Sequence, residues 1–132
     1  MNYLFNLNTN DALRQSIMGI EARYEMGGIE RLSGMTLETL NEFVENNFVD
    51  LAHSFNDSPM VGYFKNFMEK YPNEGLTAHG YLVSPERDDC HVSIEGLEAS
   101  STNDDFISDF ARTFSSADEL DSKDGYQRCW YD

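Results

Sequence analysis

Residues Thr77–Leu97 read TAHGYLVSPERDDCHVSIEGL, and their pattern decides the class of fold. Two apolar-rich segments, 77–84 and 90–97, flank residues 85–89, where a proline and four charged side chains favour a turn. Apolar and polar residues alternate in the second segment. They are Cys90, Val92 and Ile94 on one side and His91, Ser93 and Glu95 on the other. A period of two predicts an antiparallel hairpin whose second strand is half-buried.

On both sides of this hairpin, apolar residues recur every three to four positions, which predicts helices. We expect four: one from a cap at Thr9 or Asn10 to Gly27-Gly28, then Thr36–Phe55, Pro59–Tyr71 and Ser101–Ser115. Strands are expected at Tyr126–Tyr131, after a turn at Asp124-Gly125, and more weakly at the alternating residues Tyr3, Phe5 and Leu7. The pattern assigns no element to the short piece around Ile29–Leu32. The predicted class is α+β, with about four helices and a small antiparallel β-sheet.

The apolar faces of these elements also predict the core. We expect it to contain Leu37, Leu40, Val44, Phe48, Leu51, Phe55, Phe64, Phe67, Val92, Ile94, Phe106, Phe110 and Phe114.

Length and composition restrict the classes of protein that the chain can belong to. Its 132 residues predict a single domain, 1–132, and the hydrophobic content of 40% argues against a disordered acidic tail. No apolar run approaches the roughly 18 residues that a membrane span needs. The absence of a basic, apolar leader and the presence of only two cysteines predict a cytoplasmic protein. The formal charge of −15 argues against binding to nucleic acid or to anionic membranes.

Two stretches contain several acidic residues but no lysine or arginine. One lies between Arg31 and Lys65, and the other between Arg87 and Arg112. Exposed helices usually mix signs, because Glu and Lys four residues apart stabilise a helix by about 0.2–0.5 kcal/mol. One interpretation is a solvated face that keeps the protein soluble. The other is an acidic surface that docks on a basic one and imitates the phosphates of DNA, and it explains the missing lysines.

The C-terminal residues Ser116–Asp132, SADELDSKDGYQRCWYD, resemble in style the ends of small acidic accessory proteins from phages and plasmids, of the anti-CRISPR and anti-restriction type. The resemblance covers about the last 17 residues and includes no specific motif. It implies a non-enzymatic inhibitor, in the cytoplasm of a bacterial host, that blocks the nucleic-acid-binding site of a defence nuclease complex. It implies no catalytic residue, and neither a cofactor nor a metal is expected.

For this function we predict partner-binding side chains in the acid-rich stretches and in the aromatic tail, where Tyr and Trp favour interfaces. They are Glu38, Glu42, Glu45, Asp88, Asp89, Asp104, Asp105, Asp109, Tyr126 and Trp130. The expected partner is a basic nucleic-acid-binding protein or nuclease complex.

Two alternatives belong to other classes. The first is a small metal- or carboxylate-dependent hydrolase that uses Asp88, Asp89, His91 or Glu95, with Cys90, His79 or the pair Glu95 and Glu98 in support. A Cys90 or Cys129 nucleophile beside a histidine belongs to the same class. The second is a self-associating structural protein, for instance a homodimer, that pairs an exposed Tyr126–Tyr131 strand edge with a second copy.

Overall fold

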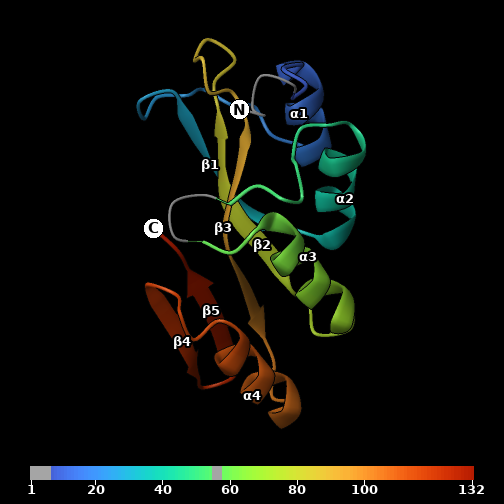
Figure 1. Ribbon diagram of the computed structural model, residues 1–132, viewed down its shortest axis with the longest axis vertical. Coiled ribbons are helices and arrows are strands. Elements are labelled where there is room, and N and C mark those ends of the chain that lie inside the picture. The colour runs from blue at the N-terminus through green and yellow to red at the C-terminus, as the bar shows by residue number, and fades with distance from the viewer. Residues whose placement is uncertain (1–6, 55–57) are drawn as a thin grey trace.

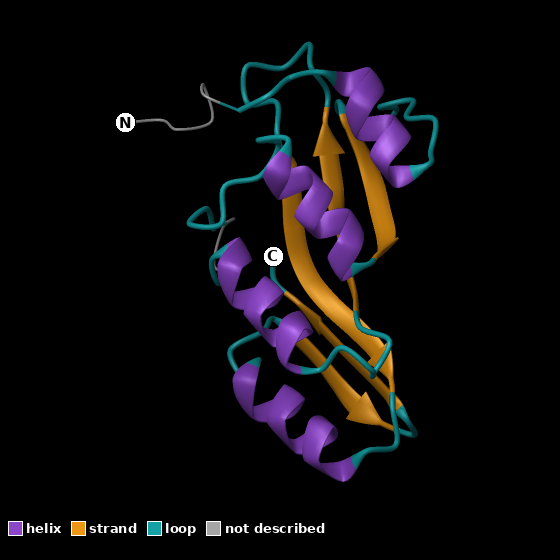
Figure 2. Cartoon of the chain, turned by 90° about the vertical axis from the view of Figure 1, so that its right-hand side faces the viewer, coloured by secondary structure: helices purple, strands orange, loops and turns teal. Residues whose placement is uncertain are grey.

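The computed structural model describes residues 7–54 and 58–132, which form a five-stranded antiparallel sheet with four helices on one of its faces (Figures 1 and 2). The strand order is β1-β2-β3-β5-β4. The predicted α+β class is therefore confirmed. In chain order the elements are α1 (Asp11–Met18), β1 (Ile29–Met35), α2 (Leu37–Glu45), α3 (Val61–Lys70), β2 (Thr77–Val83), β3 (Val92–Ser100), α4 (Asp104–Thr113), β4 (Glu119–Lys123) and β5 (Tyr126–Trp130).

The predicted hairpin forms the centre of the sheet. Strand β2 pairs with β3 in a register that places Ala78 opposite Leu97 and Leu82 opposite Val92. The prediction that β3 is half-buried is wrong, because the polar residues His91, Ser93 and Glu95 are all buried. Neighbouring side chains cover this second face: the His53 and Tyr81 rings contact His91, and the Arg31 guanidinium pairs with Glu95.

Two glycines allow the sheet to bend at its middle. The register of the β2–β3 ladder shifts between His79 and Gly80. A Cβ on Gly80 would lie 1.8 Å from the Ser93 carbonyl oxygen, and one on Gly96 would lie 1.9 Å from that of Cys129. Only glycine, which has no Cβ, lets two strands approach this closely. Strand β3 passes through this region and joins the β1–β2 part of the sheet to the β5–β4 part (Figure 1).

Two helices are shorter than predicted. Asn10 caps α1 as expected, but the helix ends at Gly19, whose φ of +68° provides a left-handed C-cap, and not at Gly27-Gly28. Helix α2 ends at Glu45 rather than at Phe55. Its cap residue Asn46 donates a side-chain hydrogen bond to the Glu42 carbonyl oxygen, and the next residue, Asn47, has a φ of 62°. A left-handed residue at that point turns the chain out of the helix.

Two strands had no clear signal in the sequence. Strand β1 falls on the piece around Ile29–Leu32 and pairs only with β2. Strand β4 forms a hairpin with β5 through Asp124-Gly125, where both φ angles are positive, at 56° and 76°. This is the geometry of a two-residue hairpin turn. Because β5 lies between β3 and β4, Tyr126–Tyr131 is not a free strand edge, and that part of the self-association hypothesis is wrong.

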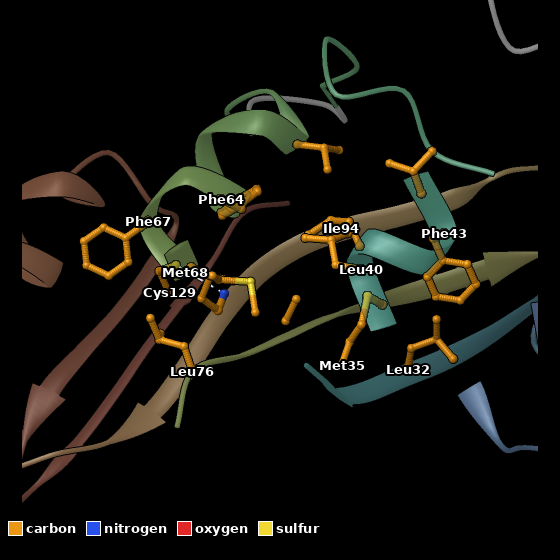
Figure 3. Close-up of a cluster of buried hydrophobic side chains, with 14 of the residues drawn as sticks. Leu32, Met35, Leu40, Phe43, Phe64, Phe67, Met68, Leu76, Ile94 and Cys129 are labelled. Atoms are coloured by element: carbon orange, nitrogen blue, oxygen red, sulfur yellow. Dashed lines mark hydrogen bonds between the residues drawn. The ribbon is translucent and has the colours of Figure 1, made fainter. Parts of the chain in front are cut away.

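The core fills the space between the helices and the sheet (Figure 3). The predicted members Leu40, Phe48, Phe64, Phe67, Val92, Ile94, Phe106, Phe110 and Phe114 are buried. Leu37 and Val44 are partly buried against this cluster. Leu51 is 36% exposed because the chain has left the helix before it, so its prediction as a core residue is wrong. Phe55 and the alternating residues Tyr3 and Phe5 lie outside the described residues.

Candidate functional site

Most positive charge of the molecule is held in internal ion pairs. Seven of the nine basic residues take part: Arg14, Arg31, Lys65, Lys70, Arg87, Arg112 and Arg128. Their partners are six carboxylates, because Asp109 accepts from both Lys70 and Arg112. The field at the surface is therefore set by the many acids outside these pairs.

Helix α2 presents the most regular row of such acids. Thr36 caps the helix by accepting a hydrogen bond from the Thr39 amide at 3.2 Å, and Leu40 and Phe43 face the core. Glu38, Glu42 and Glu45 follow at spacings of four and three, so they share the opposite, exposed side over about 10 Å of helix length. Within the described ranges none of the three forms an ion pair. We call these three residues the α2 ridge.

The other predicted acids do not join this ridge. Asp88 and Asp89 lie in the loop between β2 and β3, at one end of the molecule, and Asp89 is paired with Arg87 at 2.9 Å. Asp104 and Asp105 lie exposed in the first turn of α4, at the other end (Figure 1). Helix α3 separates α2 from α4 (Figure 2). The structure therefore brings together Glu38, Glu42 and Glu45 but not the whole predicted set.

Asp109 is a structural residue, and its prediction as a surface contact is wrong. Its side chain is only 8% exposed and accepts hydrogen bonds from Lys70 at 2.7 Å and from Tyr71 at 2.6 Å. Arg112 and Thr113 donate to its other oxygen, each at 3.0 Å. Hydrogen bonds from Lys70 and Tyr71 hold the pKa of Asp109 well below its usual range, although burial acts in the opposite direction. The carboxylate ties α3 to α4.

The aromatic tail divides between core and surface. Tyr131 is buried, whereas Tyr126 is 38% exposed and Trp130 is half-buried. The exposed pair lies on the face of the sheet opposite the helices, because along β5 they alternate with the buried residues Gln127 and Cys129. These rings are therefore not next to the α2 ridge.

A second network, which sequence patterns did not reveal, fixes the first helix to the sheet. Arg14 is fully buried and donates to the carbonyl oxygens of Val83 at 2.9 Å and His91 at 3.2 Å. Its guanidinium also forms an ion pair with Asp11 at 2.8 Å, and the Asp11 carboxylate accepts a hydrogen bond from the Tyr24 hydroxyl. Although burial opposes it, hydrogen bonds from Tyr24 and Arg14 lower the pKa of Asp11. A lone arginine in a polar segment gives no signal of burial, so only the tertiary contacts identify it.

The residues of the hydrolase hypothesis are held by structural partners. Burial raises the pKa of the Cys129 thiol to about 12 and also raises that of Cys90, which disfavours the nucleophilic thiolate. His79 contacts the Cys129 carbonyl oxygen through Nε2 at 3.1 Å, and His91 contacts the Asp89 carbonyl oxygen. Among residues 7–54 and 58–132, no three His, Cys, Asp or Glu side chains are grouped as metal ligands.

The carboxylates Glu95 and Glu98 both lie on the face of the sheet opposite the helices, but different partners hold them. Glu95 accepts a hydrogen bond from the Arg31 guanidinium at 2.7 Å, and Glu98 accepts one from the Tyr126 hydroxyl at 2.7 Å.

No helix in the described part of the chain has the length and apolar character to cross a membrane. Comparison with protein-family models, with curated protein sequences and with solved structures gives no match. The geometry and charge of the chain itself therefore carry the functional argument.

Proposed function

We propose that this protein is a non-enzymatic inhibitor that lays an acidic surface, led by the α2 ridge, across the basic nucleic-acid-binding site of a bacterial defence nuclease complex. The single observation that carries the proposal is the row of Glu38, Glu42 and Glu45, which forms no ion pair with the residues that the structure describes, in a molecule that pairs most of its basic residues internally. A basic groove on a partner supplies the missing opposite charge.

Glu42 and Glu45 lie at positions that are unfavourable for the isolated helix, whereas Glu38 lies in the first turn, where an acid is favoured. Glu42 and Glu45 lie in the last turn of α2, which has no basic residue, and the partial negative charge of a helix C-terminus disfavours anions by about 0.3–1 kcal/mol. Glu38 and Glu42 form a like-charge pair four residues apart, which costs about 0.2–0.5 kcal/mol. Solubility alone requires no particular arrangement, since acids placed at helix N-termini serve it equally well. Docking on a basic partner explains why Glu42 and Glu45 lie in the last turn of α2.

The spacing of the row suits a site built for phosphates. Carboxylates one helical turn apart lie about 5–6 Å from each other, and the row spans about 10 Å. Duplex DNA presents about one charge per 1.7 Å of axis, so the ridge imitates part of a single backbone rather than a whole duplex. The exposed acids Asp104 and Asp105 add negative charge on the same helical side of the molecule (Figure 2).

A tagged pull-down from nuclease-treated bacterial lysate, at low and high salt, tests the proposal. We expect a basic nucleic-acid-handling protein to be recovered at low salt, lost at high salt and displaced by a competing oligonucleotide. The triple variant Glu38→Gln, Glu42→Gln, Glu45→Gln should lose this protein.

The matched control is Glu21→Gln, Glu25→Gln, Glu86→Gln, which changes the net charge equally at exposed positions away from α2. It should retain the partner. Equal losses in both triple variants, or no loss in either, would show that the α2 ridge is not the docking surface.

A further inference from the structure

The face of the sheet that the helices leave open carries two adjoining hollows. The first, of 470 Å³, is lined by Arg31, His79, Glu95, Glu98, Glu119, Arg128 and Trp130 among others. The second, of 390 Å³, is lined by Glu74, Thr77, Glu98 and Tyr126 together with Ala99 and Ser100 at the end of β3. Glu98 lines both hollows, and we call the two hollows together the sheet groove.

The bend of the sheet produces this groove. Gly80 lines the first hollow, and neither Gly80 nor Gly96 places a side chain on the strands where the register shifts. Trp130 stands opposite Gly96 in the β3–β5 ladder, and Arg128 stands opposite Glu98. At its middle the His79 ring lies over Gly96, and the Trp130 ring and charged side chains stand beside it.

The charges of the sheet groove are not balanced. Arg31 is paired with Glu95 at 2.7 Å, and Arg128 is paired with Glu119 at 3.0 Å. Both arginines of the groove thus have a carboxylate of their own. In the described part of the chain Glu98 and Glu74 form no ion pair.

Neutral donors hold these two carboxylates in place. Glu98 accepts from the Tyr126 hydroxyl at 2.7 Å, and Glu74 accepts from the Ser101 hydroxyl at 2.8 Å and from the Asn103 amide at 3.3 Å. These donors orient the two carboxylates and supply no positive charge of their own.

We infer that the sheet groove binds a basic peptide segment, with an arginine or lysine side chain seated between Glu98 and the Trp130 ring. A carboxylate and an indole face are the two groups that bind a guanidinium or ammonium ion best, through a charge-assisted hydrogen bond and a cation–π contact. Glu74 receives the next basic side chain of an extended segment, because residues on one side of a strand recur at about 7 Å. This inference rests on the proposed function, since it gives the basic partner a second point of attachment.

The only tryptophan of the chain lies in this groove, which makes binding directly measurable. The probe is acetyl-tetraarginine amide, and acetyl-tetracitrulline amide, which is neutral and nearly the same shape, is its control. We expect a saturable change in Trp130 fluorescence with the arginine peptide and none with the citrulline peptide.

The variant Glu98→Gln should raise the Kd by about fivefold. The matched variant Glu42→Gln, on the opposite side of the sheet, should change the Kd by less than about twofold, because its charge is distant and screened. Calorimetry with Trp130→Phe, which keeps an aromatic ring of lower cation affinity, should also show weaker binding. No saturable change, or equal effects of the two glutamate variants, overturns the inference.

The same variants separate this inference from the proposed function. Recovery of a partner that depends on the α2 ridge but not on Glu98 would overturn the sheet groove alone. Saturable, Glu98-dependent binding of the arginine peptide by a protein that recovers no partner would overturn the proposed function alone.

Discussion

The variant Asp109→Asn provides the sharpest test of how the helical layer is held together. Its carboxylate accepts four hydrogen bonds: from Lys70 and Tyr71 at one oxygen, and from Arg112 and Thr113 at the other. Asparagine keeps one acceptor oxygen and places an amide donor where two of the donors now point. About half of the network is therefore lost, together with the negative charge.

The magnitude follows from the exposure of the partners. Side chains of Lys70 and Arg112 are 60% and 76% exposed, so each pair with Asp109 contributes at most about 1 kcal/mol. A hydrogen bond from a hydroxyl group to the buried carboxylate contributes about 1–1.5 kcal/mol. Losing one ion pair and one hydroxyl hydrogen bond predicts a decrease of about 1–2.5 kcal/mol in the free energy of unfolding at pH 7. For a domain of this size the Tm should fall by about 5–10 °C.

The pH dependence gives a second, independent expectation. Because the folded protein lowers the pKa of Asp109 below its ordinary value of 3.8, the carboxylate stabilises the fold fully above that value. This contribution is lost progressively as the pH falls below about 4, toward the folded pKa. The difference in the free energy of unfolding between the wild type and Asp109→Asn should therefore be constant from about pH 5 to 7. It should be smaller at about pH 3.

Urea denaturation followed by circular dichroism measures both effects. The control is Asp105→Asn, the same substitution on the exposed side one turn earlier in α4, which should lower the stability by less than about 1 kcal/mol, the contribution of an acid in the first turn of a helix. The reasoning is refuted if the two variants lose the same stability at pH 7. It is also refuted if the deficit of Asp109→Asn does not narrow in acid.

Three further changes are expected to alter stability. Arg14→Lys should lower the free energy of unfolding, measured by urea denaturation, by about 3 kcal/mol, because an ammonium group cannot reach two backbone carbonyls and a carboxylate at once. A loss below about 1 kcal/mol would contradict this. Gly96→Ala should cost about 3 kcal/mol or more, or abolish soluble expression, since its Cβ would lie 1.9 Å from the Cys129 carbonyl oxygen. Glu42→Gln combined with Glu45→Gln should raise the free energy of unfolding by about 0.5–1 kcal/mol at low salt, with a smaller gain at high salt; a loss of stability would mean that these acids have a favourable role within the fold.

Sequence patterns identified the elements that have a strong apolar periodicity. Helix α4 was predicted because Phe106 and Phe110 recur at helical spacing. Strand β3 was predicted because Val92 and Ile94 recur at the spacing of a strand. Strands β1 and β4 lie at the edges of the sheet and carry charges on their open face, so their sequences IERLSGM and ELDSK show no such recurrence. The end of α2 was missed because Phe48 and Leu51 continue the helical spacing by chance, whereas the backbone conformation of Asn47 stops the helix.

The sequence by itself determined the charge of the molecule and the α2 ridge. Helical spacing alone places Glu38, Glu42 and Glu45 on one side of a helix, and no basic residue stands near them in the chain. Only the tertiary structure decided that Asp109 is buried while Asp105 is exposed. It also decided that Glu98 and Trp130 line one groove. The reason is physical: helical and strand periodicities act over a few residues, whereas burial and pairing depend on which distant segments pack together.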